Sequence, residues 1–343
     1  MKIVTIIGNR PQFIKTVLVS KEIRKSDKEI LVHTGQHYDE NLSDIFFNEL
    51  KIPGPEINLG IAEANQGRQT GYMIKGIEDI LMKERPDCMI VYGDTNSTLA
   101  GSIAGSKLHI PIVHIEAGLR SFNKQMPEEI NRILTDHVST LLFCPNNKAI
   151  QNLNNEGIFE GVLNCGDVME EVFEFVYKNI PKTESETYAY MTMHRAENTN
   201  DNIILTKRIQ QVGEIDSDII WPIHPRTKKQ LTEFNITIPL NVKLIEPQGY
   251  YKNIEYIKNS KIIITDSGGL QKEAYWAGKP CFTLRNETEW MNTIAEGWNT
   301  IISIEDNLEQ KIKNFLIPKK KYVRIKNTSE SKLIIEKIRD LIP

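Results

Sequence analysis

The sequence predicts an α/β fold with two parallel sheets, and three observations indicate it. Short apolar runs alternate with longer amphipathic segments along the chain, which is the pattern of βαβ units. The 343 residues exceed one typical core and fit two domains. Predicted strands also end on titratable residues, such as Asp94 after Val-Tyr-Gly and His194 after Tyr-Met-Thr-Met. Because ligands bind outside the carboxyl ends of strands in such sheets, these residues predict one catalytic cleft that draws on both halves.

Composition narrows the class of protein. Hydrophobic residues make up 40% and charged residues 25%, as in a soluble globular enzyme, and the net charge of −3 gives no support for a nucleic-acid partner. The N-terminus becomes polar too early for a signal peptide, and no apolar run approaches the roughly 18–20 residues that span a membrane. The four cysteines are widely spaced, so we expect reduced core thiols in a cytoplasmic protein.

The alternation gives the expected elements in order. A polar stretch within residues 168–186 predicts the break between the domains, which we place at 1–168 and 169–328, followed by a separate C-terminal helix within 329–343. Strands are expected near 2–7, 29–34, 88–93, 110–115, 140–144, 162–165, 187–193, 218–223, 242–245, 261–265, 280–284 and 300–303. Helices are expected near 11–25, 40–50, 66–84, 96–107, 127–138, 146–156, 201–214, 226–233, 252–258, 268–277, 306–315 and 329–341.

Two strand-to-helix junctions look suited to anions. Gly8-Asn-Arg10-Pro11-Gln-Phe-Ile-Lys15 follows the first strand, and Pro11 suits the first turn of a helix. Arg10 and Lys15 would add charge to a helix N-terminus, although a capped helix with two surface cations is the simpler alternative. In the second half, Asp266-Ser267-Gly268-Gly269 allows backbone N–H groups to approach a diphosphate without an intervening Cβ. Glu273, one turn later, could bind the hydroxyls of a ribose.

Carboxylates and histidines supply candidate acids and bases. Asp94 and Glu116 end neighbouring strands, and Glu128 begins a helix after Pro127, so the three could work on opposite faces of a sugar. Helix capping and salt bridges are the alternative for each one alone. His194-Arg195 and His224-Pro-Arg226 pair a histidine with an arginine at strand ends, and Gln36-His37 ends another strand.

Metal and nicotinamide chemistry find no support in the motifs. His114-Ile-Glu116 and Pro280-Cys281 have the form of part of a zinc deaminase signature, but Leu284 stands where the second cysteine belongs. The glycine fingerprint of dinucleotide-binding folds and the Walker A loop are both missing. We therefore expect no metal and no cofactor.

Taken together, the motifs resemble those of the non-hydrolysing UDP-N-acetylglucosamine 2-epimerases over nearly the whole chain. The resemblance implies two Rossmann-like domains in the GT-B arrangement, with the active site in the interdomain cleft and the C-terminal helix packed back on the first domain. The motifs that carry it are Gly8–Lys15, Thr34-Gly-Gln-His37, Gly93-Asp-Thr-Asn-Ser-Thr98, His114-Ile-Glu-Ala-Gly-Leu-Arg120, Pro127-Glu-Glu-Ile-Asn-Arg132, His194-Arg-Ala-Glu-Asn198, Pro222-Ile-His-Pro225, Thr265–Ala274 and Arg285-Asn-Glu-Thr-Glu-Trp290.

The resemblance also implies a reaction and a set of roles. The C2 proton is removed while UDP leaves C1, a 2-acetamidoglucal stays bound, and C2 is reprotonated on the other face before UDP adds back, so that UDP-GlcNAc and UDP-ManNAc interconvert. It implies a homodimer that serves cell-surface polysaccharide synthesis and has a UDP-sugar as its small-molecule partner. The catalytic residues would be Asp94, Glu116, Glu128 and His194; the substrate and UDP contacts Arg10, Lys15, Arg132, His224, Ser267, Gly268, Gly269, Glu273, Arg285, Thr288 and Glu289; and an allosteric UDP-sugar site Gln36, His37, Gln66, Arg68 and Arg195.

Two departures leave the sugar open. Many members read Arg-Pro-Glu-Ala near the N-terminus and Thr-Glu-Arg-Pro-Glu later, whereas this chain has Gln12-Phe13 and Trp290-Met-Asn292. It resembles more closely the branch with epimerases of UDP-2,3-diacetamido-2,3-dideoxyglucuronic acid. A carboxylate at C6 would need a cation, for which Arg120, Arg195 and Arg226 are candidates. A GT-B glycosyltransferase, a hydrolysing relative and an inactive sugar-nucleotide sensor are the other readings of the same residues.

Overall fold

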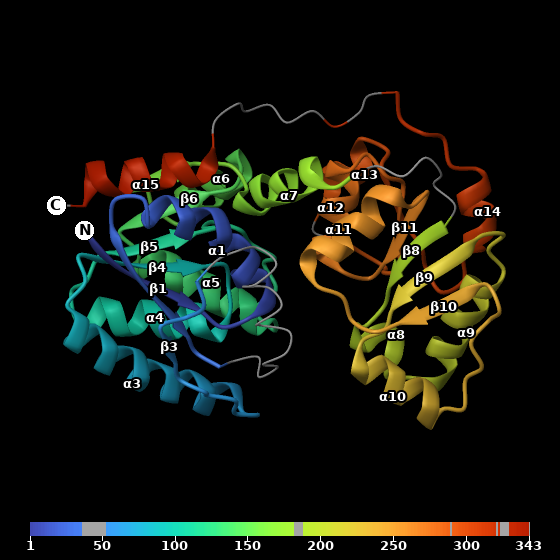
Figure 1. Cartoon of the computed structure of the whole chain (residues 1–343), viewed down its shortest axis with the longest axis horizontal. Helices are drawn as coiled ribbons and strands as arrows, with labels where there is room; N and C mark the ends of the chain where they lie inside the picture. The colour runs from blue at the N-terminus through green and yellow to red at the C-terminus, as the bar shows by residue number, and fades with distance from the viewer. Residues whose placement is uncertain (36–52, 182–187, 289, 320–321, 323–328, 343) are drawn as a thin grey trace. The chain divides into compact units, whose positions relative to one another are not determined.

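The computed structural model describes residues 1–35, 53–181, 188–288, 290–319, 322 and 329–342, and it divides into two compact units. Unit 1 comprises Met1–Val172 with Lys326–Pro343, and unit 2 comprises Phe173–Ile325. Figure 1 shows that each unit is a sheet flanked by helices on both faces. No helix among the described residues is long and apolar enough to cross a bilayer.

The described strands of unit 1 form one parallel sheet in the order β3-β2-β1-β4-β5-β6-β7. Strand order reverses between β1 and β4, and ligands bind at such a reversal in open α/β sheets. Apolar side chains fill both faces, with Ile3 and Ile90 in one cluster and Val4 and Met89 in the other. The strands are β1 (Lys2–Ile7), β2 (Lys28–His33), β3 (Ile57–Asn58), β4 (Cys88–Tyr92), β5 (Ile112–Ile115), β6 (Leu141–Cys144) and β7 (Val162–Asn164).

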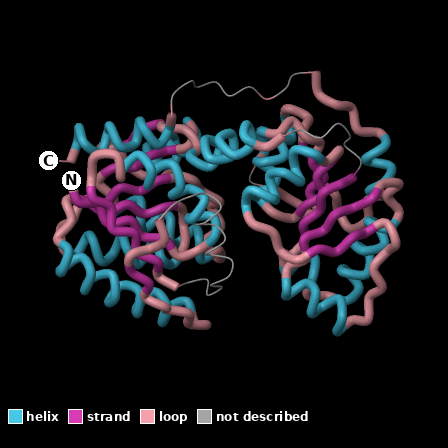
Figure 2. Tube along the Cα trace, viewed as in Figure 1, coloured by secondary structure: helices cyan, strands magenta, loops and turns pink. Residues whose placement is uncertain are grey.

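Helices cover this sheet on its two faces (Figure 2). Helix α1 begins with a capping box. The side chain of Asn9 accepts the backbone N–H of Gln12, and the side chain of Gln12 accepts the backbone N–H of Asn9. The unit's helices are α1 (Arg10–Ile23), α3 (Gln66–Glu84), α4 (Asn96–Lys107), α5 (Pro127–Val138), α6 (Asn147–Asn155) and α15 (Glu330–Leu341), with the start of α7 (Val168–Asn179). The helix predicted near 40–50 lies outside the described residues.

The C-terminal helix α15 belongs to unit 1. Ile334, Ile335 and Ile338 are buried in the same cluster as residues of β1 and α1. The carboxylate of Glu171 accepts the backbone N–H of Ser331 at 2.8 Å, and Arg339 pairs with Asp27 at 2.6 Å. These contacts join the end of the chain to its beginning.

Helix α5 has an inverted pattern of exposure. Its buried residues are polar, namely Glu129, Asn131, Thr135 and Asp136. Apolar residues recur at every fourth position on its outer face, where Met126, Ile130, Leu134 and Val138 are 38–46% exposed. The polar inner face therefore points to a site beneath α5 rather than to an ordinary core.

Unit 2 repeats the architecture with a parallel sheet in the order β10-β9-β8-β11-β12-β13. Its core packs Met191, Trp221, Ile264 and Phe282 against the surrounding helices. The strands are β8 (Tyr188–Thr192), β9 (Asp218–Pro222), β10 (Val242–Ile245), β11 (Ile262–Thr265), β12 (Cys281–Thr283) and β13 (Asn299–Ile301). The helices are α8 (Ala196–Thr199), α9 (Asn202–Gly213), α10 (Pro225–Glu233), α11 (Tyr250–Asn259), α12 (Gly268–Trp276), α13 (Met291–Ala295) and α14 (Leu308–Lys313).

The division between the two units falls inside the predicted break at 168–186, between Val172 and Phe173. Much of that stretch is nevertheless helical, because helix α7, which we did not predict, occupies Val168–Asn179. The apolar residues Val168, Val172 and Val176 recur at every fourth position and are buried, so the segment has a helical core face. The polar residues between them made this period hard to recognise in the sequence.

The four cysteines are buried and free, and burial raises the pKa of the Cys88, Cys144 and Cys281 thiols to about 12.

Candidate functional site

Two residues of the predicted site form an ion pair at the carboxyl ends of β1 and β5. Lys15 Nζ, in the second turn of α1, lies 2.5 Å from Glu116 Oε2. Glu116 has a φ of +73°, a left-handed conformation that costs an ordinary residue energy and that often marks a functional position. Lys15 Nζ also lies close to the turn after β4: a Cβ built on Gly93 would be 3.3 Å from it.

A second carboxylate, Asp94, pairs with a different cation. Arg132 of α5 contacts Asp94 through Nη2 and Glu129 through Nη1, the latter at 2.7 Å. Burial alone would lower the pKa of Arg132, but the charges of Asp94 and Glu129 outweigh it and raise that pKa. Glu129 in turn accepts the backbone N–H groups of Ser121 and Phe122, and these bonds with Arg132 hold its pKa low despite burial. Arg132, predicted as a substrate contact, is thus bound to the predicted acid–base carboxylate.

A pocket of ≈ 170 Å³ opens beside these pairs in unit 1. Asp94 and Glu128, two of the three predicted acid–base carboxylates, both line it. Gln66, predicted to belong to an allosteric site, lines the same pocket. The residues around it are Asn9, Gln66, Asp94, Thr95, Asn96, Pro127, Glu128 and Asn131.

Gln12 has a structural role in the turns beside this pocket. Its side chain is 1% exposed, and its Oε1 accepts the N–H of Gly8 at 2.7 Å. Its Nε2 donates to Tyr92 O at 2.8 Å and also contacts Thr95 and Thr98. Gln12 therefore ties the turn after β1 to the turn after β4. Arg10, the first residue of α1, is partly exposed beside it.

In unit 2, one buried carboxylate organises the end of β8. Asp266, fully buried, accepts the backbone N–H of His194 at 3.0 Å and that of Arg195 at 2.9 Å. The imidazole Nδ1 of His194 lies 3.4 Å from Asp266 Oδ1, while the ring is 44% exposed. Asp266 belongs to the turn that we predicted for a diphosphate, and its carboxylate also holds the backbone of His194 and Arg195. The His194 ring lies 6.1 Å from that of His224, measured between centroids.

The turn that follows Asp266 starts helix α12 at the order reversal between β8 and β11. Ser267 is the N-cap, and its hydroxyl accepts from Leu270 N at 3.5 Å. A Cβ at Gly269 would touch only Ser267 Oγ, at 3.9 Å, so packing within the chain does not demand a glycine there. Glu273 is buried on the same helix. The helix N-terminus thus keeps an open approach to its N–H groups.

The remaining predicted residues are dispersed. Arg285 lies near Glu197, with 3.7 Å between Nε and Oε1. Thr288 is buried and donates its hydroxyl to Gln271 Oε1 at 2.6 Å, which points to a packing role. Arg68 is exposed on α3, and His224 caps α10, where it accepts from Arg226 N at 3.2 Å. Gln36, His37 and Glu289 lie outside the described residues.

Sequence reasoning missed a buried polar cluster beneath the site. His114 was weighed only as a metal ligand and Asp136 was not singled out, yet their side chains are in contact at 2.6 Å. Arg120 is 1% exposed and pairs with Asp136 and Glu156, so it is not available to a C6 carboxylate of a sugar. The only signal in the sequence was a histidine inside an apolar strand and an aspartate in an amphipathic helix. Among the residues that the structure describes, no group of three or more His, Cys, Asp or Glu side chains is placed to hold a metal ion.

Residues 21–332 match the family model described as UDP-N-acetylglucosamine 2-epimerase. A Methanococcus maripaludis protein named UDP-N-acetylglucosamine 2-epimerase homolog is 48% identical over 99% of this chain and 100% of its own. The UDP-2,3-diacetamido-2,3-dideoxy-D-glucuronate 2-epimerase of Pseudomonas aeruginosa is 49% identical over 88% of each chain.

A solved structure agrees over the full length. The Methanocaldococcus jannaschii UDP-GlcNAc 2-epimerase, crystallised with UDP-GlcNAc and UDP, superposes with a TM-score of 0.86 at 38% identity and covers 99% of this chain and 100% of its own. The two parallel sheets with flanking helices are those of this GT-B-like fold. The chain therefore belongs to the UDP-N-acetylglucosamine 2-epimerase family of isomerases.

Proposed function

We propose that this epimerase interconverts UDP-GlcNAc and UDP-ManNAc. The observation that carries the proposal is that two carboxylates at neighbouring strand ends, Asp94 and Glu116, each face their own cation. A reaction that removes a proton from one face of C2 and returns it to the other needs two such groups. The bound UDP-GlcNAc of the Methanocaldococcus jannaschii enzyme supports the substrate class.

The chemistry would proceed in two steps. A carboxylate takes the C2 proton, the C–H electrons form the C1–C2 double bond, and the C1–O bond breaks toward UDP. A second group then protonates C2 from the opposite face while the UDP oxygen returns to C1. Asp94, Glu116 and Glu128 supply the acids and bases in this scheme. His194 is the fourth catalytic candidate.

The departing diphosphate needs positive charge and N–H donors. We assign these to the first turn of α12 at Ser267, Gly268 and Gly269, with Arg10 and Lys15 as the cations from unit 1. The open approach to Gly269 supports this assignment. Glu273 would bind the ribose hydroxyls. That both units act on one substrate stays a prediction.

The test is to incubate the enzyme with UDP-GlcNAc and follow the products by proton NMR. The proposal expects an equilibrium mixture with UDP-ManNAc and no build-up of free UDP on long incubation. Steady release of UDP with N-acetylmannosamine would instead identify a hydrolysing enzyme. Turnover only on addition of a sugar acceptor would identify a glycosyltransferase.

UDP-2,3-diacetamido-2,3-dideoxyglucuronic acid is the second candidate substrate, favoured by the 49% identity to the Pseudomonas aeruginosa enzyme. With Arg120 committed to Asp136 and Glu156, Arg195 and Arg226 remain as partners for a C6 carboxylate. Measuring kcat/KM for both sugars decides between them. A preference of a hundredfold or more for the uronic acid, about 2.7 kcal/mol of transition-state binding, would replace UDP-GlcNAc as the substrate.

We further propose a homodimer formed through the outer face of α5. Met126, the N-cap, and Ile130, Leu134 and Val138 of this helix make an exposed apolar stripe, and contiguous exposed apolar surface is a mark of protein–protein interfaces. Antiparallel pairing of two copies would set the acidic first turn of one helix beside the last turn of the other, which carries His137. Leu134→Glu should give a monomer by light scattering, while Leu316→Glu, at an exposed residue of unit 2, should not. A dimer unchanged by Leu134→Glu would refute this interface.

A further inference from the structure

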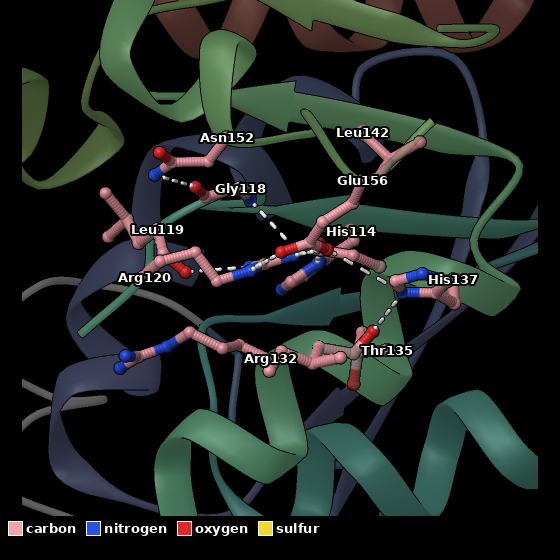
Figure 3. Close-up of polar contacts among 12 residues, drawn as sticks. His114, Gly118, Leu119, Arg120, Arg132, Thr135, His137, Leu142, Asn152 and Glu156 are labelled. Atoms are coloured by element: carbon pink, nitrogen blue, oxygen red, sulfur yellow. Dashed lines mark hydrogen bonds and ion pairs between the residues drawn. The ribbon is translucent and has the colours of Figure 1, made fainter. Parts of the chain in front are cut away.

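A chain of four buried or half-buried ionisable side chains lies beneath the turns that carry Asp94 and Glu116. His114 Nδ1 is 2.6 Å from Asp136 Oδ1, and both side chains are completely buried. Asp136 Oδ2 is 2.7 Å from Arg120 Nη1, and Arg120 Nε is 2.7 Å from Glu156 Oε1. Figure 3 shows His114, Arg120 and Glu156 converging, while the guanidinium of Arg132 extends away from them. The reaction scheme above makes no use of this cluster.

The contacts of His114 fix the orientation of its ring. Nδ1 faces the Asp136 carboxylate, and Nε2 lies 2.7 Å from the carbonyl oxygen of Gly93. The Gly93 carbonyl can only accept, so Nε2 is the donor in that bond. Although burial would raise the pKa of Asp136, the charges of His114 and Arg120 hold it below its ordinary value. Arg120 lies between the carboxylates of Asp136 and Glu156, so these buried charges are compensated.

This pair holds both catalytic turns by their backbones. The carbonyl that accepts from His114 belongs to Gly93, whose φ is +62° and which directly precedes Asp94. Asp136 Oδ2 accepts the N–H of Gly118 at 3.1 Å, two residues after Glu116. The carbonyl of Gly118 accepts from Asn152 at 2.9 Å, so this peptide is held on both sides.

We propose that His114 and Asp136 are a positioning pair that fixes the Asp94 and Glu116 carboxylates relative to each other. The inference rests on the proposed function, since proton transfer on the two faces of C2 requires both carboxylates to lie within reach of the same carbon atom. Neither residue of the pair is exposed, so it acts through the Gly93 and Gly118 peptides and not on the sugar. A misplacement of about 1 Å can cost on the order of a hundredfold in rate.

The experiment compares three variants of the full-length enzyme. His114→Phe keeps a planar ring but removes both ring nitrogens, His114→Gln keeps an N–H within reach of Gly93, and Asp136→Asn removes the charge. We expect kcat to fall roughly 10- to 100-fold in His114→Phe and Asp136→Asn, with KM and UDP affinity within about threefold of wild type. His114→Gln should recover part of the lost kcat.

Glu29→Gln is the matched control. Glu29 is a buried carboxylate of the same unit, bonded to Thr5 at 2.7 Å and paired with Arg24, but it sits at the amino end of β2, away from the turns. It should lower thermal stability and leave kcat unchanged. If Asp136→Asn does not fold, the His114 variants decide alone, because the contacts of Asp136 with Arg120 and Gly118 do not involve the His114 ring.

The outcomes separate this inference from the proposed function. A wild-type enzyme that fails to epimerise at C2 contradicts the function. An active wild type whose His114→Phe keeps its kcat, or whose His114→Gln is no faster than His114→Phe, overturns the positioning pair alone. A kcat loss in Glu29→Gln as large as that in His114→Phe would also overturn it, since general destabilisation would then explain both.

Discussion

Lys15 Nζ lies 2.5 Å from Glu116 Oε2, so the carboxylate after β5 is held by an ammonium from the second turn of α1. Only 8% of the Lys15 side chain is exposed. The pair thus joins the predicted phosphate side of the site to its predicted base. Removing the cation leaves a largely buried carboxylate without its partner, which is costly.

Lys15→Met should therefore lower kcat by at least about tenfold and also weaken UDP binding, because the proposed site uses this cation for both tasks. Steady-state kinetics with UDP titration measures the two effects. Lys21→Met, at an exposed lysine of the same helix, is the control and should behave as wild type. Normal kcat in Lys15→Met would contradict the role given to the pair.

Asp94→Asn, Glu116→Gln and Glu128→Gln should each lower kcat by on the order of 10²–10⁴, as the loss of a general acid or base does. UDP affinity should change little, because the diphosphate is assigned to other groups. Calorimetric titration with UDP checks that each variant still binds. Near-normal turnover in all three would show that the carboxylates are misassigned.

The paired charges also predict how stability depends on pH. Since the folded-state pKa of Asp136 is lowered, its contribution to stability is present above the unfolded value, about 3.9, and is lost as the pH falls toward the folded pKa. The free energy of unfolding of Asp136→Asn should therefore fall less steeply below about pH 5 than that of wild type. Urea unfolding at several acid pH values measures both slopes. Equal slopes would mean that Asp136 is not ionised in the folded protein.

Helix α15 should be an integral part of unit 1. Ile338 is completely buried in the cluster shared with β1 and α1, so Ile338→Ala should cost about 2–5 kcal/mol of stability. Leu341→Ala, at a residue of the same helix that is 51% exposed, should cost far less. Denaturant unfolding of both variants tests this, and a similar small loss in each would place α15 outside the cooperative unit.

The sequence predicted which residues stand at the strand ends around the site, but not the side-chain contacts within it. Strand ends at Asp94, Glu116 and His194 followed from local patterns, because an apolar run and the polar residue after it are adjacent in the chain. The pairing of His114 with Asp136 spans 22 residues and depends on how α5 crosses β5, which no local pattern encodes. The same limit explains Gln12 and Arg120, whose partners became visible only when the turns after β1, β4 and β5 were placed together.

Helix α7 was missed for a different reason. The polar residues within 168–186 suggested a linker, although Val168, Val172 and Val176 have a helical period. Amphipathic helices on α/β sheets usually bury a narrow apolar face, whereas the buried face of α5 is polar. Reading such helices requires the contact partner, which the sequence does not supply.

Deuterium incorporation is the most direct measurement of the central claim, which is that a side chain of this site removes the proton at C2. The enzyme is incubated with UDP-GlcNAc in D2O until the two sugars equilibrate, and the products are examined by proton NMR and mass spectrometry. The account predicts UDP-ManNAc with one deuterium at C2, because a side-chain acid that exchanges with solvent reprotonates the glycal. Epimerised product that retains its original proton at C2 would contradict it.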